Sequence, residues 1–398
     1  MTTPAESYAA AKKRGKHPLT IQFIEQFDFG FDEFQITACQ AVEDGKGVLV
    51  AAPTGAGKTV VGEFAAFSAL AQGKKCFYTT PIKALSNQKF QEFVERFGED
   101  RVGLLTGDTN INSEADVLVM TTEVLRNMLY ANSTTLSNLG SVVMDEVHYL
   151  ADKSRGAVWE EVLIHLMESV QVISLSATVS NAEEFGDWLG EVRGQTEVIV
   201  SEIRPIPLYQ HVLIGDRLVD LFREQGRINP EILGLEREAL RQVRTPRHRR
   251  ERFGEGDNRL SRPEIIEKLQ RENLLPAITF IFSRAGCDAA VKQCLAAGVK
   301  LTTTEERLEI AQTAARYTQN LAEEDLEVLG YRDWLIALER GIAAHHAGLL
   351  PSFKGAVEEL FKRGLVKAVF ATETLALGIN MPARTVVLEK LTKWNGEG

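Results

Sequence analysis

Short apolar runs alternate with longer helical patterns from about residue 36 to residue 200. The apolar runs occupy residues 47–51, 76–79, 117–120, 141–144 and 172–175. Between them apolar residues recur at helical spacing, as in residues 60–68. Strand runs that are separated by helices imply crossover connections and therefore a parallel sheet. The pattern predicts an α/β domain.

The alternation stops in the middle of the chain. No strand-like run is evident from about residue 215 to 275, and residues 241–262 hold eight arginines against three acidic residues, a formal charge of +5. We interpret this stretch as an insertion or an interdomain connection. The arginine-rich segment is either a solvated insertion or an auxiliary clamp for nucleic acid. Its composition favours neither over the other.

Beyond residue 275 the alternation resumes, with apolar runs at 278–282, 366–370 and 385–388 and helical stretches such as 308–329 between them. Two similar α/β domains in tandem are the resulting prediction. The expected ranges are an N-terminal tail (1–20), a first domain (21–205), a connection (206–275) and a second domain (276–398).

Composition narrows the class of protein. The 398 residues are 44% hydrophobic and 25% charged, which is typical of a globular chain, and the formal charge is −10. That charge argues against nucleic-acid binding by a diffuse basic surface, although it permits a local basic groove. Four cysteines are too few for a disulfide framework, and the chain shows neither a secretory signal nor a run of about 18 apolar residues. We expect a cytoplasmic protein without a membrane segment.

A phosphate-binding loop is predicted between the first strand run and the helical pattern after it. Residues 52–59 read Ala-Pro-Thr-Gly-Ala-Gly-Lys-Thr. Within this loop Pro53, Thr54 and Ala56 stand beside the two glycines. In such a loop the backbone N–H groups can surround phosphate oxygens. Gly55 and Gly57 permit the tight turn, Lys58 adds a positive charge, and the Thr59 hydroxyl can bind Mg²⁺.

An acidic pair follows the apolar run at 141–144. Asp145 and Glu146 lie at the predicted carboxyl edge of the sheet, where open α/β folds build their sites. Asp145 can hold Mg²⁺ and Glu146 can take the proton of an attacking water. Such a pair is weak evidence alone, but with a phosphate-binding loop in the same domain the catalytic interpretation is favoured over a solvated strand end.

Adenine is the favoured base. Gln35 follows Phe31 and Phe34, so an aromatic surface and an amide could together meet an adenine ring. The chain lacks the Asn-Lys-x-Asp tetrapeptide that guanine specificity requires. ATP with Mg²⁺ is the predicted cofactor pair.

Taken in order, the motifs resemble the superfamily-two helicases, and within them the DEVH-box group of superkiller-like helicases, most nearly its actinobacterial members. The motifs that carry the resemblance are Phe29–Gln35, Thr80–Gln88, Met120–Glu123, Asp145–His148, Arg155–Glu160, Ser176–Thr178, Arg204–Pro207, Ala344–Pro351 and Ala371–Pro382. They extend over nearly the whole chain.

The resemblance implies two RecA-like domains, ATP in the cleft between them and a single strand of RNA or DNA across their top. The residues it assigns to the strand are Thr80, Lys83, Thr121, Ser283, Arg284, His345, His346, Gly348 and Thr372. It assigns Gly378 and Asn380 to the nucleotide. Contacts of this kind hold phosphates without reading bases. We expect a monomer; a nuclease or RNA-processing partner is not identifiable from sequence.

One departure concerns the end of the chain. The Gln…Gly-Arg-Ala-Gly-Arg motif with which the family closes its second domain does not occur before Gly398. We therefore expect a fragment of a longer helicase. The leading hypothesis is an ATP-dependent helicase, by resemblance 3′ to 5′. The alternatives are a nucleic-acid-stimulated translocase that remodels complexes without separating strands, and a binding scaffold with a vestigial ATP site.

Two tempting features favour structural roles. Residues 158, 159, 162, 163, 166 and 167 form an apolar stripe at helical spacing, which predicts core rather than a platform for nucleic acid. The pair His345 and His346 has no third ligand in sequence range, so a zinc site is not predicted.

Overall fold

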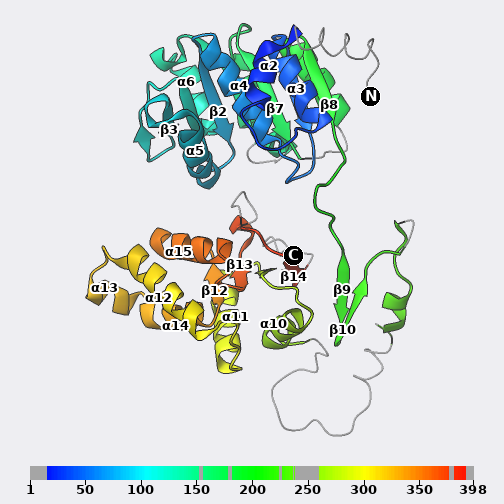
Figure 1. Cartoon of the computed structure of the whole chain (residues 1–398), viewed down its shortest axis with the longest axis vertical. Coiled ribbons are helices and arrows are strands. Elements are labelled where there is room, and N and C mark those ends of the chain that lie inside the picture. The colour runs from blue at the N-terminus through cyan, green and yellow to red at the C-terminus, as the bar shows by residue number, and fades with distance from the viewer. Residues whose placement is uncertain are drawn as a thin grey trace. The chain divides into compact units, whose positions relative to one another are not determined.

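The computed structural model describes residues 16–151, 156–177, 182–223, 226–235, 237, 260–375 and 381–390. The chain divides into two compact units, Met1–Pro207 and Leu208–Gly398 (Figure 1). The arginine-rich segment lies almost wholly outside the described residues, as do Arg155, Thr178, Gly378 and Asn380.

The first unit alternates strands with helices, as the apolar pattern predicts. Its strands are β1 (Gly47–Ala51), β2 (Lys75–Thr80), β3 (Val102–Leu105), β4 (Asn110–Ile111), β5 (Val117–Thr121), β6 (Leu139–Met144), β7 (Gln171–Ser176) and β8 (Thr196–Val200). Its helices are α2 (Pro18–Ile24), α3 (Glu33–Glu43), α4 (Thr59–Ala71), α5 (Lys83–Phe97), α6 (Thr122–Tyr130), α7 (Gly156–His165) and α8 (Ala182–Arg193).

These strands form one eight-stranded sheet in the order β4-β3-β5-β2-β6-β7-β1-β8. All neighbours are parallel except β3 and β4, which pair antiparallel at one edge. The five predicted strand runs became β1, β2, β5, β6 and β7, the inner part of the sheet. The sequence pattern missed β3, β4 and β8, which complete its two sides.

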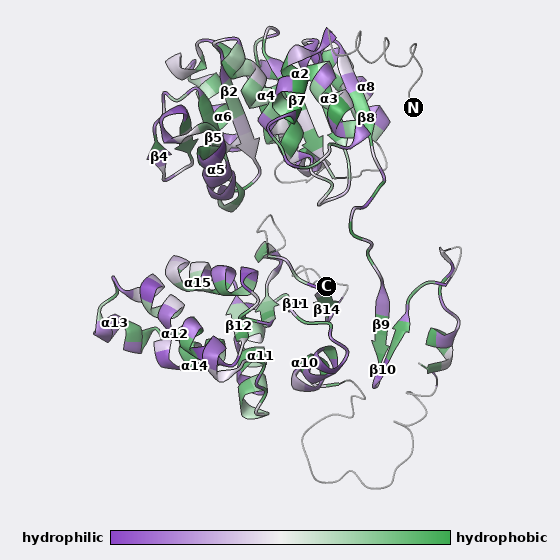
Figure 2. Ribbon diagram, in the orientation of Figure 1, coloured by the Kyte–Doolittle hydropathy of each residue, from purple (hydrophilic) through white to green (hydrophobic). Residues whose placement is uncertain are grey.

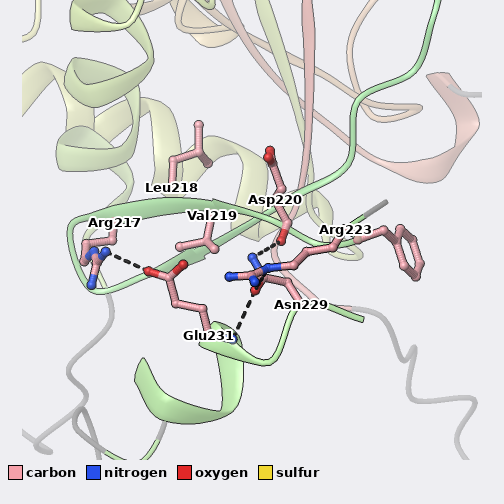
Figure 3. Close-up of a pocket in the computed structure, with 8 residues that line it drawn as sticks. Arg217, Leu218, Val219, Asp220, Arg223, Asn229 and Glu231 are labelled. Atoms are coloured by element: carbon pink, nitrogen blue, oxygen red, sulfur yellow. Dashed lines mark hydrogen bonds and ion pairs between the residues drawn. The ribbon is translucent and has the colours of Figure 1, made fainter. Parts of the chain in front are cut away.

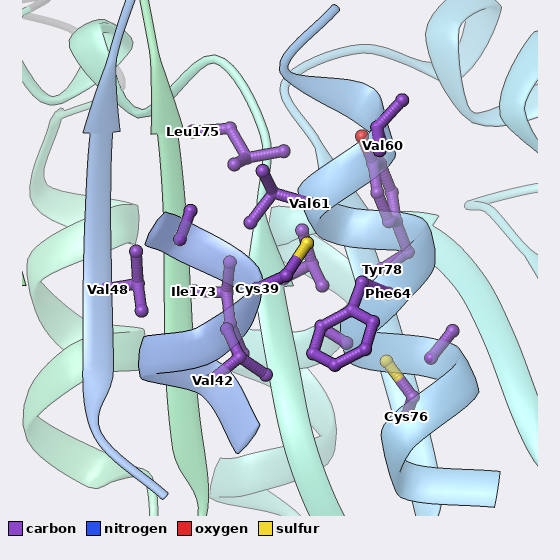
Figure 4. Close-up of a cluster of buried hydrophobic side chains, with 14 of the residues drawn as sticks. Cys39, Val42, Val48, Val60, Val61, Phe64, Cys76, Tyr78, Ile173 and Leu175 are labelled. Atoms are coloured by element: carbon purple, nitrogen blue, oxygen red, sulfur yellow. The ribbon is translucent and has the colours of Figure 1, made fainter. Parts of the chain in front are cut away.

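Both faces of this sheet are buried, and neighbouring residues of one strand serve opposite cores. Val48 and Val50 of β1 belong with Phe64 of α4 to the core on one face, and Figure 4 shows Val48 and Phe64. Leu49 belongs with Trp159 of α7 to the core on the other face. This is the period-two alternation of a strand covered on both sides. In Figure 2 β7 is green, whereas α5, which shows much of its surface to solvent, is largely purple.

The predicted apolar stripe of α7 is core. Val158, Trp159, Val162, Leu163 and Leu166 are buried, with Trp159 fully so. Met167, after the helix, is the exception: half of it is exposed.

The second unit holds a four-stranded parallel sheet of order β12-β13-β11-β14. Its strands are β11 (Ala277–Phe280), β12 (Ile342–His345), β13 (Ala368–Ala371) and β14 (Thr385–Leu388). Its helices are α10 (Arg262–Arg271), α11 (Arg284–Ala296), α12 (Thr304–Thr318), α13 (Glu323–Val328), α14 (Tyr331–Glu339) and α15 (Pro351–Lys362). The predicted α/β class holds in both units; β12 was not predicted.

The stretch expected to lack strands contains one. β9 (His211–Ile214) and β10 (Arg217–Asp220) pair as an antiparallel hairpin, so the prediction of no strand from residue 215 onward was wrong. β10 reads Arg-Leu-Val-Asp, with too few apolar residues to register as a strand run, and only Val219 of it is buried. Pairing across the hairpin, rather than burial, defines this strand.

A pocket lies beside the hairpin (Figure 3). Its polar groups bind one another: Arg217 pairs with Glu231 at 2.8 Å, and the Asn229 amide oxygen accepts from Arg223 Nε at 3.0 Å. The Asn229 amide nitrogen donates to the Asp220 carbonyl at 3.1 Å. The bonds to Arg217 and Asp220 fasten Glu231 and Asn229 to β10.

Candidate functional site

The phosphate-binding loop lies where the sequence predicts, between the end of β1 at Ala51 and the start of α4 at Thr59. Gly55 and Gly57 have φ values of +85° and +80°, a conformation that residues with a side chain rarely adopt. Pro53 and Ala56 are buried, whereas Thr54 and Gly55 are exposed. The sequence therefore forms the predicted turn, with part of its backbone open to solvent.

Lys58 is folded back onto its own loop. Its Nζ donates to the carbonyl oxygens of Ala52 at 2.7 Å and Pro53 at 3.1 Å. Burial lowers the pKa of this amine, against the opposing pull of Glu146 and Asp145. A phosphate would give the ammonium a charged partner in place of two neutral carbonyl oxygens. We therefore expect the Lys58 side chain to leave these carbonyls when a phosphate binds.

Gln35 contacts the phosphate-binding loop directly. It is buried, its Nε2 donates to the carbonyl oxygens of Ala56 at 3.3 Å and Gly57 at 3.1 Å, and its Oε1 accepts from the Asp32 backbone N–H at 2.8 Å. The last bond is half of a capping box that begins α3. The amide thus ties the start of α3 to the loop, and its predicted contact with adenine stays a prediction.

The predicted aromatic neighbours of Gln35 pack inward. Phe31 and Phe34 are partly buried against the first core, and Phe31 stacks on the exposed ring of Phe29 with 5.7 Å between centroids. Arg96 of α5 lies over the ring of Phe27 at 4.3 Å. Phe29 is the ring of this group that offers surface to a ligand.

The acidic pair lies directly after β6, two strands away from β1 in the sheet. Asp145 is buried; its Oδ2 accepts from the Tyr78 hydroxyl at 2.7 Å and its Oδ1 from the Glu146 backbone N–H at 2.9 Å. These two bonds hold the carboxylate in a fixed orientation. Tyr78 was not singled out from the sequence, since the contact spans 67 residues.

Glu146 has the environment of a proton acceptor. Its φ is +52°, an unusual value for a residue with a long side chain. Burial and the neighbouring Asp145 raise its pKa to about 7, while Lys58 and Lys89 act in the opposite direction. Its Oε2 lies 3.2 Å from His148 Nδ1, and burial lowers the pKa of that imidazole. A carboxyl poised near neutral pH suits general base chemistry.

The donors predicted for a metal are suited to Mg²⁺. Thr59 is half-buried and offers a hydroxyl oxygen, and each oxygen of Asp145 keeps a lone pair beyond the bond it accepts. Magnesium binds oxygen ligands and commonly takes only one or two from the protein. Within the described ranges no cluster of three or more His, Cys, Asp or Glu could hold a metal ion.

Lys89 of α5 reaches this site and was missed by the sequence analysis. Its Nζ donates to Thr59 Oγ1 at 3.1 Å and to Glu92 Oε2 at 2.6 Å, and the side chain is 9% exposed. Lys89 and Thr59 are 30 residues apart in the chain, and no sequence motif predicts that they meet.

The first unit brings its predicted strand-binding residues to one edge of the sheet. Thr80 and Thr121 are register partners at the carboxyl ends of β2 and β5. Both are buried, and the Thr80 hydroxyl bonds Ser86 Oγ at 2.7 Å. Lys83 is exposed and forms an ion pair with Asp108. Lys83 therefore offers its side chain to a phosphate, whereas the Thr80 hydroxyl is engaged in bonds within the fold.

In the second unit the predicted residues differ sharply in exposure. Ser283 and Arg284 are exposed at the start of α11, where the Ser283 hydroxyl accepts from the Gly286 N–H at 3.2 Å. Both follow β11, and Thr372, half-buried, follows β13. Ser283 and Arg284 are accessible to a nucleic-acid backbone as the prediction requires.

The two histidines are buried and paired with carboxylates. His345 Nε2 lies 2.8 Å from Glu358 and His346 Nε2 lies 3.0 Å from Asp288. His346 Nδ1 accepts from the Gly348 N–H at 3.1 Å. Because Nδ1 accepts this bond, Nε2 is the ring nitrogen that can donate to Asp288. Direct contact of these imidazoles with a strand would require them to leave these partners.

A parallel α/β sheet with a phosphate-binding loop after one strand and an acidic pair after another defines a nucleoside-triphosphate hydrolase. The described residues include no helix long and apolar enough to cross a membrane.

Comparison with known proteins specifies the family. Residues 32–185 match the DEAD/DEAH box helicase family. "Probable helicase HelY" of Mycobacterium leprae (strain TN) is 59% identical over 393 residues, which cover 94% of this chain and 42% of the relative. The chloroplastic "DExH-box ATP-dependent RNA helicase DExH15" of Arabidopsis thaliana is 43% identical over 94% of this chain and 35% of its own length. Human "Superkiller complex protein 2" is 41% identical, over 93% and 31%.

Residues 32–185 therefore form a DEAD/DEAH box helicase domain, which is RecA-like and typical of ATP-hydrolysing enzymes, and over nearly its whole length the chain is similar to helicases of the superkiller-like group. The resemblance drawn from the motifs is confirmed, including its closeness to actinobacterial members. The chain spans about two fifths of the length of the mycobacterial relatives.

Proposed function

We propose that this protein is an ATP-dependent helicase that moves along a single strand of RNA and separates duplexes ahead of it. The proposal rests chiefly on one observation: the first unit presents Lys58, Thr59 and the acidic pair after parallel strands, as phosphoryl-transfer enzymes do. RNA is preferred to DNA because the Arabidopsis relative is named an RNA helicase. The cytoplasm is the proposed compartment, in keeping with four unpaired cysteines.

The residues would act in sequence. Backbone N–H groups of residues 55–57 bind phosphate oxygens, and Lys58 leaves the Ala52 and Pro53 carbonyls to join them. Thr59 and Asp145 would hold Mg²⁺, which would supply positive charge to the phosphates. Glu146 Oε accepts the proton of the attacking water.

Strand contacts follow from the exposed cations. Lys83 at the start of α5 and Arg284 at the start of α11 each lie at the carboxyl end of a parallel strand, the edge where such sheets bind ligands. Contacts with backbone phosphates fix a strand without reading its bases. The proposed binding therefore depends little on base sequence.

A strand-displacement assay tests the proposal. RNA and DNA duplexes of one sequence, each with a 3′ or a 5′ overhang, are incubated with ATP and Mg²⁺, with Lys58→Ala as the inactive control. We expect unwinding of the 3′-tailed RNA duplex by the wild type alone. ATP hydrolysis that the strand stimulates without displacement would favour the remodelling translocase, and no hydrolysis at all would favour the scaffold.

A further inference from the structure

Lys89 is a buried cation placed on a predicted metal ligand. It lies in the first half of α5, and its Nζ donates to the hydroxyl oxygen of Thr59 at 3.1 Å. The whole residue is 7% exposed. A lysine that lacks solvent must be paired, so its two partners decide where the ammonium sits.

One partner anchors the ammonium outside the phosphate-binding loop. Glu92, one turn further along α5, accepts from Lys89 Nζ at 2.6 Å with Oε2, and Gln88 Nε2 donates to its Oε1 at 2.7 Å. Both carboxylate oxygens are thus engaged from within α5. Glu92 alone would satisfy the charge of Lys89, so the bond to Thr59 is an addition that packing does not require.

The charge of Lys89 extends to the acidic pair as well. Lys89 opposes the rise in the pKa of Glu146, together with Lys58. The cation therefore lies within electrostatic range of the groups that would receive a divalent ion. Glu92 of α5 pairs with Lys89 directly, and Glu63 of α4 is affected by the charges of Lys89, Glu92 and Arg96.

We propose that Lys89 is a positioning residue that occupies Thr59 Oγ1 until Mg²⁺ takes the oxygen, and that it thereby sets the Mg²⁺ concentration at which nucleotide binds. The inference rests on the proposed function of the loop. A divalent ion on Thr59 and an ammonium on the same oxygen repel each other. Lys89 then gives up Thr59 and keeps its bond to Glu92.

Titration of a fluorescent ADP analogue at increasing Mg²⁺ tests the inference without catalysis. In Lys89→Met the competitor is gone, so the Mg²⁺ concentration at half-saturation should fall, by about threefold to tenfold for one nearby charge. In Glu92→Gln the ammonium loses its carboxylate partner and stays on Thr59. The Mg²⁺ concentration at half-saturation should therefore rise. The matched control is Lys75→Met. Lys75 pairs with Glu114 and begins β2, at the end of the strand away from the phosphate-binding loop, so its substitution should leave the Mg²⁺ concentration at half-saturation unchanged.

Binding in metal-free buffer separates this role from simple attraction of phosphate. A lysine that only attracts phosphate would make Lys89→Met bind more weakly at every Mg²⁺ concentration, and that result would overturn the inference. So would an unchanged midpoint in both variants. If Lys89→Met does not fold, Glu92→Gln decides by its own shift, and Lys89→Arg, which keeps the charge, should remain near the wild type.

Failure of the proposed function is distinguishable from failure of this inference. If Lys58→Ala binds the analogue as well as the wild type, the loop is not the nucleotide site and the proposed function fails. If Lys58→Ala loses binding while the Lys89 and Glu92 variants behave as the wild type, only the role of Lys89 is rejected.

Discussion

The side-chain amide of Gln35 donates to the carbonyl oxygen of Gly57 at 3.1 Å, in the space that any Cβ at position 57 would need. A Cβ at position 57 would lie 2.6 Å from Gln35 Nε2, whereas one at position 55 would meet nothing within 4 Å. Gly57 is therefore required twice, by its positive φ and by the contact with Gln35.

Substitutions at these glycines should separate the two requirements. Both Gly55→Ala and Gly57→Ala carry backbone strain of about 1 to 2 kcal/mol. Gly57→Ala should lower the free energy of unfolding in urea further, because it also displaces Gln35. Gly57→Ala should therefore cost less in a Gln35→Ala background than in the wild type. Equal midpoints for the two glycine variants would contradict the contact.

Removing the hydroxyl of Tyr78 should destabilise the first unit. Tyr78→Phe leaves Asp145 buried with one donor fewer, at a cost of about 1 to 3 kcal/mol in unfolding free energy. The effect should shrink in an Asp145→Asn background, which a double-mutant cycle in urea measures. Additive losses in the cycle would show that the two groups do not interact.

How much of this site was predictable depends on the distance along the chain. The turn at residues 52–59 and the pair after β6 are local signals, since each follows an apolar run directly. The packing of β2 and α5 brings three further residues to the site: Tyr78, Lys89 and Glu92. No sequence motif predicts these contacts. The loop was thus predicted, and most of the side chains that position its groups were not.

The same division holds for the fold. Inner strands such as β1 and β5 are continuous apolar runs because both of their faces are buried. β8 (Thr196–Val200) lies at the edge of its sheet and is only partly buried, so its sequence Thr-Glu-Val-Ile-Val is not a continuous apolar run. β10 is a strand because it pairs with β9 in a hairpin. Likewise, the sequence could name His345 and His346 but not the carboxylates that hold them.

Stability should depend on pH through Glu146. Its folded pKa is raised to about 7, so the folded state disfavours the ionised form, and stability is lost as pH rises from about 4.5 to about 7. Glu146→Gln removes this loss. In metal-free buffer the variant should match the wild type near pH 4 and exceed it above pH 7, by on the order of 1 kcal/mol. Urea curves that differ by the same amount at every pH would refute the assignment.

Binding of a single strand should depend on salt through a few exposed cations. Each phosphate neutralised on a single strand contributes about −0.7 to the slope of log K against log salt. Lys83→Ala and Arg284→Ala should each flatten the slope by about that amount and weaken binding to every base sequence alike. Lys292→Ala, an exposed lysine further along α11, is the matched control. Unchanged slopes and affinities in the first two variants would place the strand elsewhere.

The role of Glu146 as the base that activates water is the central claim, and one comparison tests it most directly. ATP binding and steady-state hydrolysis are measured for the wild type and Glu146→Gln with saturating single-stranded RNA and Mg²⁺. We expect the variant to bind ATP as the wild type does and to hydrolyse it about 10² to 10⁴ times more slowly, the usual share of a general base. Equal hydrolysis by the two proteins would contradict the account.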